Sequence, residues 1–455
     1  MSDPADTLFT TPEMAAIWAG EAHVRGMLAF EAALARAEAR AGVIPAAAAE
    51  AIAAACQADA FDVAAIYREA TRAGTPAIPL VRMLTDRVEG DARGYAHWGA
   101  TSQDVIDTAM VLQARAGLSL LIRRLLALGE ACAPLAERYR NTPMAGRTVM
   151  QQALPIPFGL KAARWLALTT RQIERLTEVR THISVVQLGG AAGTLASLGA
   201  TGARVTDLLA EELGLAAPEM PWHAERDRVA EVAAALGVVA GSMAKIAGDL
   251  LLLAQTEVGE VTEAASPSKG GSSTMPQKRN PVDAMMAVAA SRLAIGHVPT
   301  ILSGMAQEHE RAAGGWQAEW EALPALFRSV AGAVERTLSA LTSPEVDTER
   351  MKGNLALTGG LILSEALAMA LAQQVGRQEA YRLTRQATER ARATGVHLRQ
   401  AALDDERIRA ALSQEAIKAA LDPANYLGSS GVYIDRALEG FRALRSRSGE
   451  AAPDA

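Results

Sequence analysis

Residues 229–253 read VAEVAAALGVVAGSMAKIAGDLLLL and contain the clearest structural pattern in the chain. Apolar side chains recur there at alternating steps of three and four residues, at Val229, Val232, Leu236, Val239, Met243, Ile246, Leu250 and Leu253. This spacing places them on one face of a helix and is typical of the packing seam of a helical bundle. A helix from Glu225 to Glu263 would span roughly 55 Å, which favours the long central bundle of an oligomer over a compact monomer.

The composition of the 455 residues also predicts an all-α protein. Half of the residues are apolar but only 4% are aromatic, so the interior must be built from Ala, Leu, Val and Ile at close helix contacts. Further helices are expected between breaks that contain Gly or Pro, over residues 12–41, 46–55, 104–140, 157–181, 200–213, 281–302, 315–342 and 359–375. No segment shows a convincing strand pattern. We predict three helical domains, with a long-helix bundle in the second, over residues 1–103, 104–344 and 345–455.

Charge and cysteine usage exclude several classes of protein. The chain has 45 basic and 51 acidic residues, and no basic block indicates a nucleic-acid or membrane partner. Cys56 and Cys132 match neither a metal site nor a secreted disulfide framework, so both are expected to be buried thiols. The first twenty residues lack the features of a signal peptide, and no later stretch has the uncharged apolar length of a membrane span. We therefore expect a cytoplasmic protein.

The strongest functional motif is GGSSTMPQKRNPV, at residues 270–282. Its Gly and Ser residues provide backbone N–H and hydroxyl groups, and Asn280 followed by Pro281 predicts an N-cap and the first residue of a helix. Lys278 and Arg279 stand just before this helix start. Cations beside a helix N-terminus favour the binding of carboxylates. An ordinary basic loop before a helix is the alternative interpretation of these residues.

A second motif, HWGATSQDVIDT at residues 97–108, predicts a capping box. Thr101, with Asp104 three residues later, would open the long helix. Thr101, Ser102 and Gln103 would then present hydroxyl and amide groups at a helix N-terminus. The alternative is a cap with a purely structural role.

The motif at residues 270–282 is similar to the signature of the fumarase/aspartase/argininosuccinase superfamily, in which GSSxMPxKxNP forms a mobile loop that closes over the substrate. This resemblance implies an all-α, fumarase/aspartase-like fold in a homotetramer, with each active site shared by three subunits. It also implies that Ser272 is catalytic and that Lys278 and Asn280 contact substrate carboxylates. The amides of Ser272 and Ser273 are candidates for stabilising negative charge in the reaction.

The motif at residues 97–108 resembles the first active-site region of the same superfamily. The resemblance implies that Thr101 and Ser102 bind a carboxylate of the substrate and that His97 lies in the site.

Residues 146–155, GRTVMQQALP, resemble the second active-site region but depart from it at one position. The superfamily's lyases have a histidine directly after Gly-x-Thr, where this chain has Val149. An aliphatic side chain cannot transfer a proton, so the acid/base arrangement of those lyases cannot be carried over whole. Gln151 is a candidate substrate contact, with a purely structural role as its alternative.

Six further segments point to one branch of the superfamily. They are MLAFEAALARAEARAGVIP (27–45), GTPAIPLV (74–81), LGGAAGTLASLG (188–199), PWHAERDR (221–228), QEHERAAGGWQAEWEALP (307–324) and DPANYLG (422–428). Together they resemble the bacterial 3-carboxy-cis,cis-muconate cycloisomerases. This resemblance implies cofactor-free conversion of a small tricarboxylate, 3-carboxy-cis,cis-muconate, into 4-carboxymuconolactone during protocatechuate catabolism.

Residues 308–311 place four ionisable side chains at consecutive positions, which on a helix cannot all face one way. A solvated polar turn is one interpretation of this segment. For a tricarboxylate substrate, Arg311 would offer a planar donor with two parallel hydrogen bonds. Together with Lys278 and Asn280, it is expected to stabilise the charge that develops in the reaction. The group that moves the proton is left open among Lys278, Ser272, His97 and His309.

Three other functions are open at this point. A sulfomuconate cycloisomerase would use the same chemistry on a sulfonate. An adenylosuccinate lyase-like C–N lyase would have a histidine in the region of residues 74–81 and another near Val149, and the chain has neither. A non-catalytic structural homologue would not be expected to retain Ser272, Lys278 and Asn280 together. No spaced cluster of His, Cys or carboxylates predicts a metal site, and no cofactor is expected.

Overall fold

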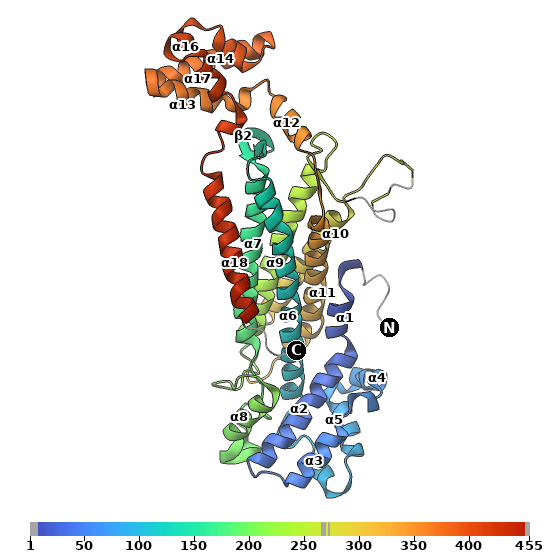
Figure 1. The fold of residues 1–455 in the computed structure, drawn as a ribbon. Coiled ribbons are helices and arrows are strands. Elements are labelled where there is room, and N and C mark those ends of the chain that lie inside the picture. Colours follow the sequence, from blue (N-terminus) through green and yellow to red (C-terminus); the bar gives the residue numbers. More distant parts are fainter. Residues whose placement is uncertain (1–7, 265–269, 272–273, 451–455) are drawn as a thin grey trace. The chain divides into compact units, whose positions relative to one another are not determined.

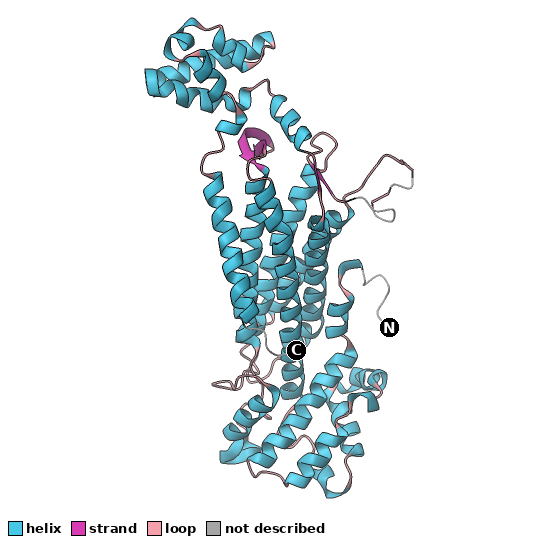
Figure 2. Ribbon diagram, viewed as in Figure 1, coloured by secondary structure: helices cyan, strands magenta, loops and turns pink. Residues whose placement is uncertain are grey.

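The computed structural model describes residues 8–264, 270–271 and 274–450, and helices dominate them (Figure 2). The predicted all-α fold class is confirmed. The chain divides into two compact units. Unit 1 comprises Met1–Arg124, Gln172–Ala244 and Met286–Glu335, and unit 2 comprises Leu125–Arg171, Lys245–Met285 and Arg336–Ala455.

Five long helices contribute residues to both units. They are α6 (Ser102–Arg138), α7 (Phe158–Ile183), α9 (Asp227–Leu253), α10 (Val282–Ser303) and α11 (Gly315–Thr342) (Figure 1). Pro134 lies inside α6 without ending it. Because both units include parts of these helices, they leave the predicted domain boundaries near residues 103 and 344 untested.

Helix α9 contains the predicted apolar seam, and all eight seam side chains are at most 4% exposed. The helix is shorter than the predicted span of residues 225–263. After Leu253 the backbone forms a turn in which Glu260 N–H donates to the Leu253 carbonyl. Gly259 enters this turn with a φ of 58°, a conformation that glycine adopts without strain. The turn ends the helix and directs the chain into strand β3 (Val261–Thr262).

Unit 1 has a core of short helices around α2. Its other helices, including short 3-10 helices labelled η, are α1 (Pro12–Ile17), α2 (Gly20–Arg40), α3 (Ala46–Ala55), η2 (Ala58–Ala60), α4 (Val63–Ala73), α5 (Ala77–Arg87), η3 (Gly90–Tyr95), η4 (Ala196–Thr201) and α8 (Gly202–Leu213). Phe30 and Leu34 of α2 share one apolar cluster with Ile52, Leu84 and Leu208 of neighbouring helices.

The polar composition of α2 is unusual for a core helix. Two of its glutamates, Glu31 and Glu38, are almost completely buried.

Unit 2 ends in a helical region with its own apolar core. Its helices are α12 (Thr348–Ala356), η5 (Leu361–Leu363), α13 (Ser364–Val375), α14 (Arg377–Thr394), α15 (Leu398–Leu403), α16 (Glu406–Ala411), α17 (Gln414–Ala420), η6 (Pro423–Asn425) and α18 (Ser430–Glu450). Leu367, Leu383, Ile408 and Ile417 pack in this core.

Unit 2 contains a β-hairpin, although no segment of the sequence shows a convincing strand pattern. β1 (Pro143–Thr148) pairs antiparallel with β2 (Gln151–Pro157), and Thr148 lies opposite Gln151. The two loop residues, Val149 and Met150, have φ values of 48° and 63°. Positive φ at both positions matches the right-handed twist of a two-residue hairpin, but such turns usually contain Gly or Asn. The sequence therefore lacks the usual turn signal.

Two smaller features complete the description of the fold. β3 pairs with β4 (Glu345–Val346) in unit 2.

Cys132 is buried as predicted, whereas Cys56 is only partly buried, and neither forms a disulfide. Burial raises the pKa of both thiols to about 12, so neither has the thiolate character of a reactive cysteine.

Candidate active site

The N-terminus of α6 forms the centre of the candidate site in unit 1. The Thr101 N–H donates to Oδ2 of Asp104 at 2.9 Å, and the helix begins at Ser102. This bond is one of the two in the predicted capping box, while the Asp104 N–H donates to the Thr101 carbonyl at 3.0 Å. Thr101 and Ser102 are only partly buried, so their hydroxyls lie at the positive end of a helix, where anions are stabilised.

Asp104 also fixes the backbone that faces this helix start. Its side chain is completely buried and accepts from the N–H groups of Gly189 and Gly190 at 2.9 and 3.0 Å. His223 Nε2 lies 2.6 Å from Asp104 Oδ1. The sequence interpretation treated Asp104 only as a cap and did not identify His223. Asp104 thus holds three separate segments of unit 1 together.

The structure brings Arg311 to the same helix start. Its Nε donates to Gln103 Oε1 at 3.1 Å, and Nη2 lies 3.4 Å from the Gly190 carbonyl oxygen. Gln103 Nε2 in turn donates to Asp107 and to the His223 carbonyl at 3.1 and 2.9 Å, which fixes the orientation of its amide. Both partners of Arg311 are neutral oxygens. They hold the guanidinium without cancelling its charge.

His97 enters the site with a left-handed backbone, at φ 56°. Its Nδ1 lies 2.7 Å from Oε1 of Glu31, a carboxylate that is completely buried on α2. Burial by itself lowers the pKa of His97. The negative charge of Glu31, the hydrogen bond to Glu31 and the charge of Asp104 together outweigh this effect, so the His97 pKa lies above the ordinary histidine value. The imidazole is therefore disposed to carry a positive charge. Sequence reasoning did not find Glu31, which is 66 positions away.

His309 occupies an exposed turn between α10 and α11, with a φ of 49°. Its neighbour Glu308 accepts a hydrogen bond from the Ala313 N–H at 3.1 Å, and this bond lowers the Glu308 pKa. Within the described residues, no hydrogen bond links His309 to the partners of Arg311. The segment is thus a turn, as one interpretation held, and only Arg311 reaches the α6 start.

Gln103 donates to Asp107, which belongs to a buried ion network with Arg226 and Glu319. Arg226, 1% exposed, donates to both oxygens of Asp107 at 2.7 and 3.0 Å and to Glu319 at 2.6 and 3.0 Å. Trp316 Nε1 donates to Asp107 at 2.9 Å. Burial opposes the charge of Arg226, yet the two carboxylates raise its pKa above the ordinary arginine value. Sequence reasoning missed this network, whose members lie far apart in the chain.

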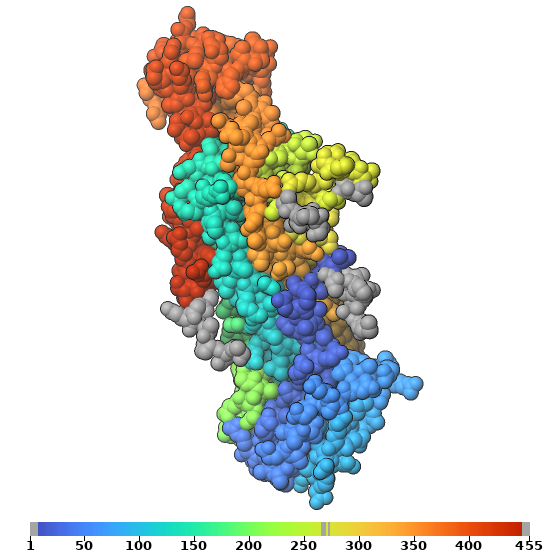
Figure 3. Space-filling view, turned by 45° about the vertical axis from the view of Figure 1, so that its right-hand side comes forward, coloured from blue at the N-terminus to red at the C-terminus, as the bar shows by residue number. Residues whose placement is uncertain are grey.

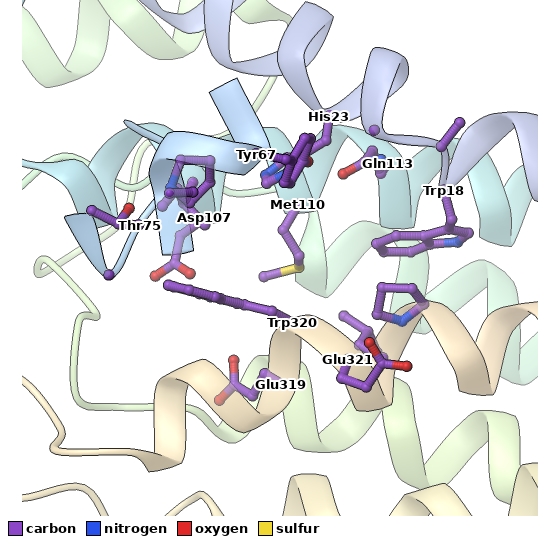
Figure 4. Close-up of a pocket in the computed structure, with 18 of the residues that line it drawn as sticks. Trp18, His23, Tyr67, Thr75, Asp107, Met110, Gln113, Glu319, Trp320 and Glu321 are labelled. Atoms are coloured by element: carbon purple, nitrogen blue, oxygen red, sulfur yellow. The ribbon is translucent and has the colours of Figure 1, made fainter. Parts of the chain in front are cut away.

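A cavity of about 550 Å³ in unit 1 has Asp107 and Glu319 among its lining residues. Figure 4 shows His23 and Tyr67 on one side of it and Glu319 and Trp320 on the other. None of the predicted site residues lines it. Its walls include Trp18, Tyr67 and Trp320, and burial lowers the pKa of His23 to about 4, so this ring is neutral.

In unit 2, the hairpin presents the segment that contains Gln151. Gln151 is exposed at the start of β2, and Val149 at the tip is 95% exposed. Arg147 anchors the hairpin by donating to both oxygens of Glu260 at 2.9 Å, and Glu260 is completely buried. The ion pair thus holds the base of the hairpin, and Val149 and Gln151 are exposed at its tip.

The described ends of the loop at residues 270–282 lie close together in unit 2. Asn280 N–H donates to the Gly270 carbonyl at 2.8 Å. A side chain at Gly270, which has a φ of 77°, would meet the Asn280 carbonyl oxygen at 2.6 Å, so only glycine fits. Ser272 and Ser273 lie outside the described residues. Lys278 is exposed at the surface, where the loop can be seen in yellow in Figure 3.

Two expectations for this loop are corrected. Helix α10 begins at Val282 and not at Pro281, and its cap is Glu263, which accepts from the N–H groups of Asp283 and Ala284 at 3.2 and 2.8 Å. The carboxylate of Glu263, directly after β3, therefore replaces the predicted Asn280 cap. Arg279 lies 3.3 Å from Glu345, so this cation is directed to a surface ion pair.

Comparison with known proteins shows which chains this one resembles. Residues 5–296 match a family described as "Lyase", and residues 360–437 match "Adenylosuccinate lyase C-terminus". The chain is 48% identical over 442 residues to the 3-carboxy-cis,cis-muconate cycloisomerase of Pseudomonas aeruginosa, with 96% of each chain covered. It is 48% identical over 419 residues to the protein of the same name from Bradyrhizobium diazoefficiens, with 91% of this chain and 93% of that one covered. The crystal structure of the 3-carboxy-cis,cis-muconate lactonizing enzyme from Pseudomonas putida matches with a TM-score of 0.92 and 43% identity, over 98% of this chain and 100% of that one.

Proposed function

Because this chain belongs to the fumarase/aspartase superfamily of lyases, we propose that it is an isomerase that converts 3-carboxy-cis,cis-muconate into 4-carboxymuconolactone. The names of the relatives support this substrate, and they do not favour the sulfonate substrate or the C–N lyase. The absence of an imidazole at Val149 also argues against the C–N lyase.

The observation that carries the proposal is the bond between Arg311 and Gln103. It joins two segments 208 positions apart at the N-terminus of α6. This bond places a fixed guanidinium close to the helix N-terminus that contains the partly buried Thr101 and Ser102. Such a group of donors suits a substrate with several carboxylates. We assign His97 to the same group.

The reaction takes up one proton, which comes from solvent through the protein, and requires no other reactant. One substrate carboxylate adds across a carbon–carbon double bond, and a proton is delivered to the neighbouring carbon. The charge of the intermediate spreads into another carboxylate, so stabilising that charge is the main task of the site. Arg311, Lys278 and Asn280 are assigned to this task, together with the Ser272 and Ser273 amides, and we also place Gln151 and His309 near the substrate.

The proposal is tested by an absorbance assay with 3-carboxymuconate, run beside adenylosuccinate and beside the sulfonate analogue. We expect isomerisation of the carboxylate substrate to the lactone and no cleavage of adenylosuccinate. Activity should be unchanged after dialysis against EDTA, because we expect no metal or cofactor to take part. Adenylosuccinate cleavage without lactone formation would contradict the proposal.

We also propose that the protein is a cytoplasmic homotetramer in which three subunits contribute to each site. By length and composition α6, α9 and α10 could each span a membrane. In the single chain only 28% of the most apolar window of α10 is buried, so either lipid or other chains must cover this helix. Arg292 lies exposed near the middle of α10, where a charge in a bilayer would cost roughly 2.5–3.5 kcal/mol. Partner chains are therefore a better cover for this helix than lipid.

Light scattering should give a mass four times that of the chain. Leu293, Ile295 and Leu302 of α10 are each 44–46% exposed in the single chain, and a tetramer would bury them. Leu293→Glu should therefore dissociate the assembly and reduce activity, because it places a charge in an apolar contact. Tyr381→Glu is the matched control, since Tyr381 is exposed on the highly polar helix α14. A fully active monomer would rule out the shared site.

A further inference from the structure

We propose that Glu31 is a positioning residue for His97, because it holds the imidazole through Nδ1 and so presents the Nε2–H of a cationic ring to a substrate carboxylate. The inference deepens the proposed function and rests on it only for the identity of that carboxylate. Glu31 itself would not touch the substrate. It acts through the histidine.

Glu31 and His97 form a buried ion pair in which, among the described residues, only one oxygen of the carboxylate is hydrogen-bonded. Glu31 Oε1 lies 2.7 Å from His97 Nδ1, and the Glu31 side chain is 0% exposed. Its other oxygen, Oε2, has no hydrogen-bond partner among the described residues. A buried carboxylate without a compensating charge is costly, so Glu31 favours both the position and the positive charge of the ring.

The groups that face the pair explain the charge of the histidine. Asp104 of α6 is the second carboxylate that acts on His97, and together with Glu31 it keeps the His97 pKa above its ordinary value despite burial. Glu38 and Cys56 are the titratable groups that interact with Glu31 from within the core. With Nδ1 engaged by Glu31, Nε2 is the nitrogen left to donate to a ligand.

Glu38 provides a matched control on the same helix. It lies seven residues after Glu31, and both of its oxygens are buried without a partner in the described part of the chain. Burial, assisted by the charge of Glu31, raises the Glu38 pKa to about 9. Glu38 is therefore neutral at pH 7, where glutamine has nearly the same shape and the same charge. Only Glu31 should respond to amide substitution.

The first experiment compares Glu31→Gln with Glu38→Gln in kcat/KM profiles between pH 5.5 and 9. In the wild type, kcat/KM should fall as the pH rises through the raised pKa of His97. Glu31→Gln should move this alkaline limb down by about one to two pH units, the effect of losing a charged hydrogen bond. Above the raised pKa of His97 the loss should be about tenfold or more, and well below the pKa of both proteins it should largely disappear. Glu38→Gln should keep the wild-type profile up to about pH 8, below the Glu38 pKa of about 9.

The second experiment measures the titration of His97 directly and needs no activity. Protein labelled with carbon-13 at the histidine Cε1 is titrated by NMR, and the His97 signal is identified by its loss in His97→Gln. We expect a wild-type midpoint above the ordinary value of about 6.5 and a lower midpoint in Glu31→Gln.

The outcomes separate the inference from the proposed function. A wild-type His97 midpoint at or below the ordinary value would overturn the inference, even if Glu31→Gln failed to fold. Identical pH profiles for the two glutamine variants would overturn it as well. If the wild-type protein does not isomerise 3-carboxymuconate, the proposed function fails while the NMR titration still decides whether Glu31 controls His97.

Discussion

Replacing Lys278 with methionine is expected to lower kcat/KM for lactone formation by more than about two decades. Methionine approximately keeps the length of the side chain but deletes the charge that we assign to a substrate carboxylate. A charge-assisted hydrogen bond is worth roughly 1.5–3 kcal/mol, and about 1.4 kcal/mol corresponds to one decade. Because the same charge would also stabilise the intermediate, the loss should exceed this range.

Arg311→Lys provides the intermediate case. Lysine keeps the positive charge but removes the planar fork, one nitrogen of which donates to Gln103. We expect kcat/KM to fall by about one to two decades, less than for Lys278→Met. Steady-state kinetics on both variants, with the oligomer confirmed by light scattering, measures the two effects.

Two further variants test whether the effects are specific. Arg279→Met deletes the neighbouring cation of the same loop, which lies against the exposed carboxylate of Glu345. An exposed ion pair contributes little, so kcat/KM should stay close to the wild-type value. Val149→His should neither raise the activity nor rescue Lys278→Met. Near-normal turnover in both Lys278→Met and Arg311→Lys would rule out the assigned roles.

Arg226→Met should destabilise the fold by about 3–5 kcal/mol, the cost of breaking a buried ion pair by removing one partner. Methionine fills similar space but leaves the carboxylates of Asp107 and Glu319 buried without their guanidinium. Loss of this support should also disturb Gln103, which donates to Asp107, and through Gln103 the position of Arg311.

Thermal and urea unfolding, followed by circular dichroism at fixed protein concentration, measure this loss. Arg228→Ala is the control, because Arg228 lies two residues away and pairs at 3.3 Å with the exposed Glu219. Its removal should change the free energy of unfolding by less than about 1 kcal/mol. Equal unfolding midpoints for Arg226→Met and the wild type would show that the buried network adds no stability.

The helices of this protein were predictable because their signals are local. The seam of α9 repeats within one turn, and each of its side chains is buried as predicted. The predicted helices at residues 46–55 and 315–342 match α3 and α11. The superfamily was predictable for a different reason, since its loop and cap motifs are contiguous, and the family matches confirm it. The activity in the relatives' names agrees with the predicted cycloisomerase.

The errors arose where a distant residue decides a local structure. The hairpin turn at Val149 and Met150 contains no glycine, and its positive φ values are maintained by strand pairing and by the Arg147–Glu260 ion pair. The cap of α10 comes from Glu263, about twenty residues earlier in the chain, so Asn280 could not reveal it. Neither feature has a signature within its own segment.

The sequence by itself determined the helical class, the apolar seam of α9 and the motifs that name the candidate site residues. Only the tertiary structure decided that Arg311 bonds Gln103 and that Glu31 bonds His97. The physical reason is the range of the interactions. Helix periodicity and capping act within a few residues, whereas the charge of a site residue is set by buried partners that become neighbours only when the chain has folded.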